Sequence, residues 1–97
     1  MNRVIWSPEA DDDFSQILTW LNENWDNNVA VSFINNVDNA IAQIQNNPLQ
    51  FPLFSNAMNI RRCVITKQSS LFYQIENQLI YILRIFDNRQ NPDRLKF

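Results

Sequence analysis

The chain has 97 residues, 45% of them apolar and 19% charged, which suffices for one domain with one hydrophobic core. It contains no His and no Gly, which excludes Ser-His-Asp triads, histidine-bearing zinc sites and glycine-rich nucleotide-binding loops. The net charge of −2 hides an asymmetry, because residues 1–60 hold one basic and seven acidic side chains and residues 61–97 hold seven basic and three acidic ones. We therefore expect a single domain over residues 1–97, with a basic C-terminal surface, no cofactor and no metal.

The N-terminal apolar run is far too short for a signal peptide or a membrane span. The single Cys63 cannot form a disulfide within the chain. Both features predict a cytoplasmic protein with no membrane partner.

Residues 3–6 are a short β-prone run that ends at Ser7-Pro8, where Ser is typical of a helix N-cap and Pro of the first helical position. Carboxylates follow at Glu9 and at residues 11–13, where they interact favourably with the positive end of a helix dipole. Three successive side chains point around a helix and cannot converge on one metal. We therefore interpret the acidic cluster as part of a helix start.

Apolar residues at helical spacing predict two helices, over residues 8–25 and 28–46, joined by a polar turn. Because the turn is short, we expect the helices to form an antiparallel hairpin. Residues 49–59 contain proline and apolar residues without periodicity, and we expect a loop there.

Three runs rich in β-branched and aromatic residues follow, separated by short polar connections at residues 67–70 and 77–78. They are residues 60–66, 71–76 and 79–86. We predict an α+β domain: a short N-terminal strand, the helical hairpin, and a three-stranded antiparallel meander with the hairpin packed on one sheet face.

Strand alternation places Arg61 and Arg62 on opposite faces of the sheet. Arg84 lies inside the most apolar strand, where an unpaired charge is expensive to bury. Two interpretations stay open. The arginines present guanidinium groups to phosphate or to an acidic partner, or Arg84 pairs with Glu76 or Asp87 while the others are solvated.

Tyr73 lies between hydrophobic neighbours and is interpreted as a core residue rather than a catalytic one. Cys63 is interpreted as a small buried hydrophobe, because the chain has no His to activate a thiol.

Several segments of the chain, in their order and spacing, resemble the RelE/ParE superfamily of bacterial type II toxins. The resemblance is greatest to its ParE-like, plasmid-stabilisation branch. The opening residues 4–17 are similar to that branch's strand, Ser/Thr-Pro-x-Ala turn and acidic helix start. The C-terminal signature is Arg61-Arg62 before a β-branched run, then Phe72-Tyr73-Gln74-Ile75, Ile82-Leu83-Arg84-Ile85 and Asp87-x-Arg89-Gln90-x-Pro92.

The resemblance implies a toxin that inhibits DNA gyrase by protein–protein binding and is neutralised by a cognate antitoxin in a hetero-oligomer. By position, the residues that match the branch, and that we expect to contact target or antitoxin, are Arg61, Arg62, Tyr73, Arg84 and Arg89. Carboxylates on the antitoxin would meet these arginines.

Two other functions remain open. One is a RelE-type endoribonuclease that cleaves mRNA on the ribosome. The chain departs from that branch, because residues 88–96 lack its C-terminal Tyr or His, and Ser70 stands where an arginine is common. The other is a non-toxic binding module of the same fold.

Overall fold

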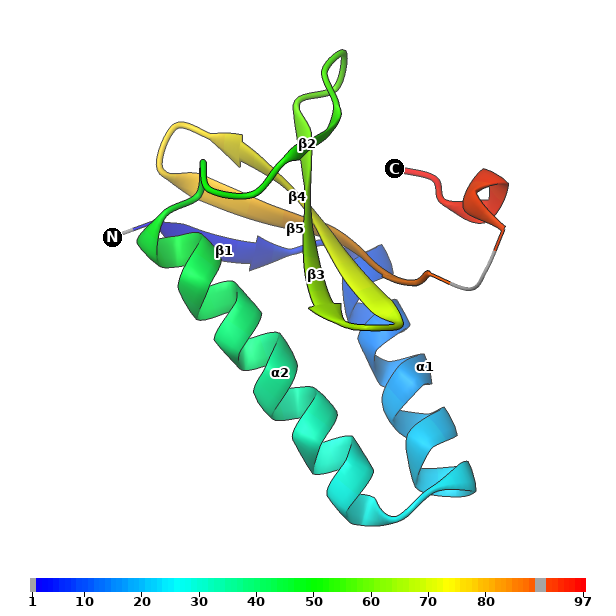
Figure 1. The fold of residues 1–97 in the computed structure, drawn as a ribbon. Helices are drawn as coiled ribbons and strands as arrows, with labels where there is room; N and C mark the ends of the chain where they lie inside the picture. The colour runs from blue at the N-terminus through cyan, green and yellow to red at the C-terminus, as the bar shows by residue number, and fades with distance from the viewer. Residues whose placement is uncertain (1, 89–90) are drawn as a thin grey trace.

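The computed structural model describes residues 2–88 and 91–97, and it confirms the α+β architecture. Two helices lie against a five-stranded sheet whose strand order is β1-β5-β4-β3-β2 (Figure 1). In chain order the elements are β1 (Arg3–Trp6), α1 (Pro8–Asn24), α2 (Asn27–Asn46), β2 (Leu53–Ser55), β3 (Ile60–Thr66), β4 (Ser69–Glu76), β5 (Leu79–Asp87) and the 3-10 helix η1 (Pro92–Arg94). Neither α1 nor α2 is long and apolar enough to cross a membrane.

The predicted meander is present as β3, β4 and β5, which pair antiparallel in sequence order. The N-terminal strand β1 adds to it in parallel beside β5, so the longest strand lies inside the sheet rather than at its edge. At the opposite edge, β2 pairs with β3 inside the segment that we expected to be a loop. That expectation was wrong for three residues, because so short a strand carries no readable alternation.

Local capping explains where the helices start. The Ser7 hydroxyl accepts a hydrogen bond from the Ala10 amide at 3.0 Å, and Pro8 occupies the first helical position. The Asp26 carboxylate accepts from the Asn28 amide at 3.0 Å and caps α2. The helix bounds agree with the predicted ones to within one residue.

Asparagine serves where a tight turn needs a left-handed backbone. Asn59 has φ 54° and Asn77 has φ 57°, and no other described residue has a positive φ. Asn tolerates this region better than other residues with a side chain, because its short polar group bonds locally. A chain without glycine can therefore still close the β4–β5 hairpin over two residues.

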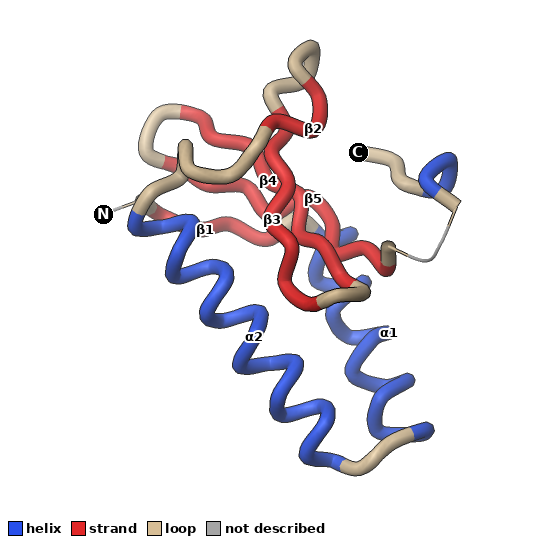
Figure 2. The backbone as a smooth tube through the Cα atoms, viewed as in Figure 1, coloured by secondary structure: helices blue, strands red, loops and turns tan. Residues whose placement is uncertain are grey.

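The core has two sides. Residues of α1 and α2 pack against one sheet face, and the buried set there includes Ala10, Val37, Ile44, Cys63, Tyr73 and Ile82. On the other face, Ile60, Phe72 and Phe86 form a smaller cluster that Leu83 and the C-terminal Leu95 cover. Figure 2 shows this C-terminal segment lying apart from α1 and α2.

Tyr73 is a core residue, as predicted, with 0% of its surface exposed. Its ring meets Phe51 edge-on, and its hydroxyl donates a 2.6 Å hydrogen bond to the carbonyl of Pro48. Arg61 donates to the carbonyl of Phe51 at 2.6 Å and so anchors the same segment. Tyr73 and Arg61 thus hold the connection between α2 and β2 against the sheet.

We predict that Tyr73→Phe lowers the free energy of unfolding by about 1–2 kcal/mol, because the Pro48 carbonyl loses its partner in a partly buried site. Tyr81→Phe is the matched control, since that half-buried residue lies on the adjacent strand and pairs with Gln74 in the sheet. Urea denaturation measures both. Equal stabilities of the two variants would contradict a structural role for the Tyr73 hydroxyl.

Candidate functional site

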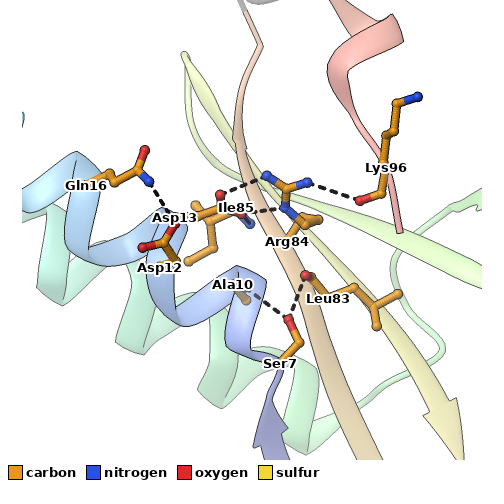
Figure 3. A network of polar contacts seen from close by, with 9 residues as sticks. All are labelled: Ser7, Ala10, Asp12, Asp13, Gln16, Leu83, Arg84, Ile85 and Lys96. Atoms are coloured by element: carbon orange, nitrogen blue, oxygen red, sulfur yellow. Dashed lines mark hydrogen bonds and ion pairs between the residues drawn. The ribbon is translucent and has the colours of Figure 1, made fainter.

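The first turn of α1 continues the edge pairing of β5 where β1 ends. The amide of Ser7 donates to the carbonyl of Ile82 at 2.9 Å, and its hydroxyl donates to the carbonyl of Leu83 at 2.8 Å. One turn later the Asp13 carboxylate accepts from the amide of Ile85 at 3.1 Å. Backbone groups of β5 that β1 no longer reaches are therefore satisfied by side chains of the α1 start (Figure 3).

Arg84 is fixed at this junction. Its Nε and Nη2 donate to the two Asp13 oxygens at 2.7 and 2.8 Å, in a bidentate pair. A third donor, Nη1, reaches the carbonyl of Lys96 at 3.1 Å. The side chains are 21% and 14% exposed for Arg84 and Asp13. The hydrogen bond to Asp13 raises the pKa of the Arg84 guanidinium above its ordinary value, so it stays charged.

This pairing corrects two predictions. Arg84 does have a carboxylate partner, but it is Asp13 on α1 rather than Glu76 or Asp87 on the sheet. The helix-dipole interpretation fits Glu9 and Asp11 in the first turn, whereas Asp13 faces the sheet. Sequence spacing does not show this, because the pair is 71 residues apart.

A β-bulge puts Arg84 on the same face of the sheet as Phe72. The register between β4 and β5 shifts between Phe72 and Tyr73, so β5 accommodates one extra residue, Leu83. Arg84 then lies opposite Phe72, and on the other side of Phe72 lies Arg62 of β3. Arg62 and Arg84 therefore lie on either side of Phe72 across three strands.

Arg62 is held by a small polar network. Its Nε donates to the Ser70 hydroxyl at 3.0 Å and its Nη2 to the side-chain oxygen of Asn88 at 3.3 Å. The Ser70 hydroxyl in turn donates to the same Asn88 oxygen at 2.8 Å, and Ser70 is fully buried. Arg61 instead turns to the α2–β2 connection, so the two neighbours have different partners, as strand alternation predicts.

The expected contact residues thus fall into three groups. Arg62 and Arg84 lie together across the sheet, and Arg61 and Tyr73 hold the α2–β2 connection. Arg89 lies outside the described residues. Arg61, Arg62 and Arg84 each donate two or three hydrogen bonds to neighbours, so only their remaining N–H groups can meet a partner.

Phe72 is covered by the C-terminal segment. The ring of Phe97 lies 5.5 Å from that of Phe72 and 6.2 Å from that of Phe54, centre to centre. Phe54 meets Phe72 edge-on at 4.8 Å, and only 2% of Phe72 is exposed. The sequence showed only a polar, basic tail here and gave no signal that its last aromatic residue closes a cluster.

The sequence analysis did not predict a groove of about 730 Å³ that lies between α1, α2, the β3–β4 turn and the end of β5. Its apolar walls include Ile17, Trp20, Leu21, Val29, Phe33 and Ile85. Half of Trp20 is exposed at its rim. A detectable signal was the pair of tryptophans near the end of α1, which is more apolar surface than a solvated helix end needs.

Cys63 is buried and faces the helices, which confirms its interpretation as a small core residue. Burial raises the pKa of the thiol from 9.0 to about 11, so it is protonated at neutral pH. Burial likewise raises the pKa of Tyr73 to about 12, with a partial lowering by Arg61. Neither group is poised to act as a nucleophile or base near pH 7.

We predict that Asp13→Asn lowers the free energy of unfolding by roughly 2 kcal/mol, because Arg84 loses its carboxylate in a mostly buried site. The control is Asp11→Asn, an exposed change on the same helix that we expect to cost under about 0.5 kcal/mol. Chemical denaturation measures both. Similar losses would mean that helix charge, rather than the junction with β5, explains the effect.

We also predict a stability loss between about pH 9 and pH 11. The folded state holds the Cys63 proton more tightly than the unfolded state, so this stabilisation is complete below pH 9 and disappears as pH rises through the folded pKa of about 11. Two pKa units correspond to at most about 3 kcal/mol. Cys63→Ala should flatten this part of the stability–pH curve, and parallel curves would refute the prediction.

The sequence over residues 4–92 matches the family model described as the ParE toxin of the type II toxin-antitoxin system, parDE. No curated protein has a significantly similar sequence. The fold is similar to a chain of the chromosomal ParDE TA system from P. aeruginosa, at 18% identity over 90% of this chain and 96% of that one, with a TM-score of 0.76.

Two other solved chains share the fold. The YoeB/ParE toxin from Agrobacterium tumefaciens is 13% identical, with 89% of this chain and 98% of that one covered and a TM-score of 0.65. A chain of the YoeB-YefM complex from Staphylococcus aureus is 16% identical, with 88% and 94% covered and a TM-score of 0.61. Since the family model spans most of its length, the chain belongs to the ParE toxin family of type II toxin–antitoxin systems, within the RelE/ParE superfamily.

Proposed function

We propose that this ParE-family toxin acts in the cytoplasm by binding DNA gyrase and blocking its reaction, and that a cognate antitoxin neutralises it. Solved structures of similar fold include both ParE and YoeB proteins, so the fold alone does not choose the target. The choice rests on what the side chains can do.

The observation that carries the proposal is that the arginine side chains are bonded to other residues of the fold. Arg84 gives three N–H groups to Asp13 and Lys96, and Arg62 is bonded to Ser70 and Asn88. A nuclease needs such groups for the phosphate in its transition state. The chain has no His, and its Tyr73 and Cys63 are buried and protonated. These facts support a surface that binds a protein over one that transfers protons.

One observation favours the endoribonuclease alternative. Arg62 and Arg84 flank Phe72 across three strands, an arrangement in which a ring could stack on a base while guanidinium groups hold phosphates. Phe54 and Phe97 cover that ring, so a base would first have to displace the C-terminal segment. We therefore rank cleavage of ribosome-bound mRNA second and the non-toxic binding module third.

The test incubates purified toxin with gyrase, plasmid DNA and ATP, with and without its cognate antitoxin. We expect loss of supercoiling and trapped double-strand breaks, both reversed by the antitoxin. Inactivity of folded toxin toward gyrase, together with mRNA cleavage on translating ribosomes, would overturn the proposal in favour of the nuclease. Inactivity in both assays, with antitoxin still bound, would favour the binding module.

Arg62→Lys separates the mechanisms further. Lysine keeps the charge but loses the planar fork, so a phosphoryl-transfer role predicts loss of most activity, whereas a protein-binding surface predicts a loss of less than about tenfold. Arg62 suits this test better than Arg84, whose replacement also disturbs the junction with α1. Arg3→Lys, an exposed change on β1, is the matched control.

A further inference from the structure

Charge is separated between the two layers of the molecule. The helical hairpin, residues 8–46, carries seven carboxylates and no Lys or Arg. The strands, turns and terminal segments carry all eight basic residues of the chain and only three acidic ones. Although the whole chain has a net charge of −2, the layer that contains the sheet is therefore positive. An anionic partner is attracted by this layer and repelled by the hairpin.

Arg62 carries a positive charge that no neighbouring carboxylate balances. It lies opposite Phe72 in the β3–β4 pair, and directly opposed residues of two strands share a face of the sheet. Its hydrogen-bond partners, Ser70 and Asn88, are neutral. Among the described residues, no carboxylate forms an ion pair with Arg62. This half-buried guanidinium is therefore fixed in place with its full charge, and its remaining N–H groups can bind an external anion.

The C-terminal segment adds two cations to the face that carries Phe72. The ring of Phe97 packs 5.5 Å from that of Phe72, centre to centre, and holds the segment there. The carbonyl of Lys96 accepts a hydrogen bond from Arg84, and Figure 3 shows the Lys96 ammonium group directed away from that guanidinium. Lys96 and Arg94 are exposed, and no described carboxylate forms an ion pair with either.

We name Arg62, Arg94 and Lys96 the basic face. The strands beneath it, β3, β4 and β5, all lie inside the sheet, so they have no free edge to which a peptide could add. Only 2% of Phe72 is exposed beneath the C-terminal segment, so a base cannot stack on that ring. The face therefore offers positive charge at several positions, which suits a ligand with regularly repeated negative charges. The phosphate backbone of a nucleic acid is such a ligand.

We propose that the basic face binds the phosphate backbone of duplex DNA without reading its sequence. The inference rests on the proposed function, because gyrase holds duplex DNA and a toxin bound to gyrase would meet that DNA. Contact with the backbone would favour binding of the toxin to the gyrase–DNA complex over the free enzyme. Arg62 would position a phosphate and transfer no proton, so this contact is binding and not cleavage.

The first test needs no gyrase. Whole toxin is titrated into a short fluorescently labelled duplex, and anisotropy measures binding from low to physiological salt. We expect log Kd to rise with log salt with a slope of roughly 2 to 3, about 0.9 for each cation that neutralises a phosphate. Because the net charge of −2 gives no overall attraction to DNA, such binding requires a local positive surface. No binding at low salt, or binding that does not depend on salt, would overturn the proposal.

Matched variants locate the site. Lys96→Gln should weaken duplex binding at low salt by about three- to tenfold and lower the slope by about one. Lys67→Gln removes the same charge from the β3–β4 turn, between two residues that line the groove beside the helices, and should leave both quantities unchanged. Arg62→Gln should act as Lys96→Gln does, whereas Arg62→Lys keeps the charge and should retain most of the binding. Equal effects of the two lysine variants would refute a site on the basic face, provided circular dichroism shows that both fold.

Two competitors identify the kind of anion. Single-stranded RNA of the same length and a poly-glutamate peptide are each added to the complex of toxin and labelled duplex. Because duplex DNA has the higher charge density, we expect each to compete at least about threefold less well than unlabelled duplex at equal total charge. Stronger competition by RNA than by duplex would overturn the proposal in favour of an mRNA site. Competition by poly-glutamate equal to that by duplex would overturn it in favour of an acidic protein segment.

A photo-crosslinking side chain tests the contact inside the gyrase–DNA complex. Val64 is 58% exposed and lies two residues from Arg62 on β3, so it shares that face of the sheet. A cross-linker at Val64 should react with labelled DNA when gyrase is present, whereas one at Val31, 45% exposed on α2, should not. Equal labelling from the two positions would overturn DNA contact by the basic face. Loss of gyrase inhibition with duplex binding intact would instead fall on the proposed target alone.

Discussion

The fold depends on how the first turns of α1 take over the edge of β5. Strand β1 pairs with β5 only as far as Ile82, and beyond that point β5 would present unpaired backbone to the inside of the molecule. Ser7 and Asp13 supply the missing partners. Because Asp13 also binds Arg84, one carboxylate fixes the helix, the strand and the arginine together. The position of the hairpin on the sheet follows from this junction.

The same junction limits what the basic residues can do. A guanidinium held by a bidentate carboxylate keeps its charge and its place, but most of its donors are no longer available to a ligand. Arg84 is in this state, and its third bond goes to the chain's own C-terminal segment. An arginine that the sequence suggests as a phosphate ligand can thus have a structural role instead. Which role it has depends on a carboxylate partner that is distant in the sequence.

The sequence predicted the parts of the fold that depend on near neighbours. Helix bounds followed from Ser7, Pro8 and the apolar spacing, and the two-residue β4–β5 turn from Asn77. Parts that depend on tertiary placement were not predictable. Asp13 differs from Asp11 only in which side of α1 packs on β5, and β2 is too short to show alternation. The groove arises only where Trp20, Phe33 and Ile85 meet from three elements.

The split of charge between the layers gives the molecule two surfaces of opposite sign. Inside each layer like charges repel, and in the hairpin this cost is offset by the helix start at Glu9 and Asp11 and by the Asp13–Arg84 pair, which joins opposite charges of the two layers. Asp26 is stabilised in the same way as the cap of α2, and no carboxylate of the hairpin meets a base within it, since residues 8–46 contain no Lys or Arg.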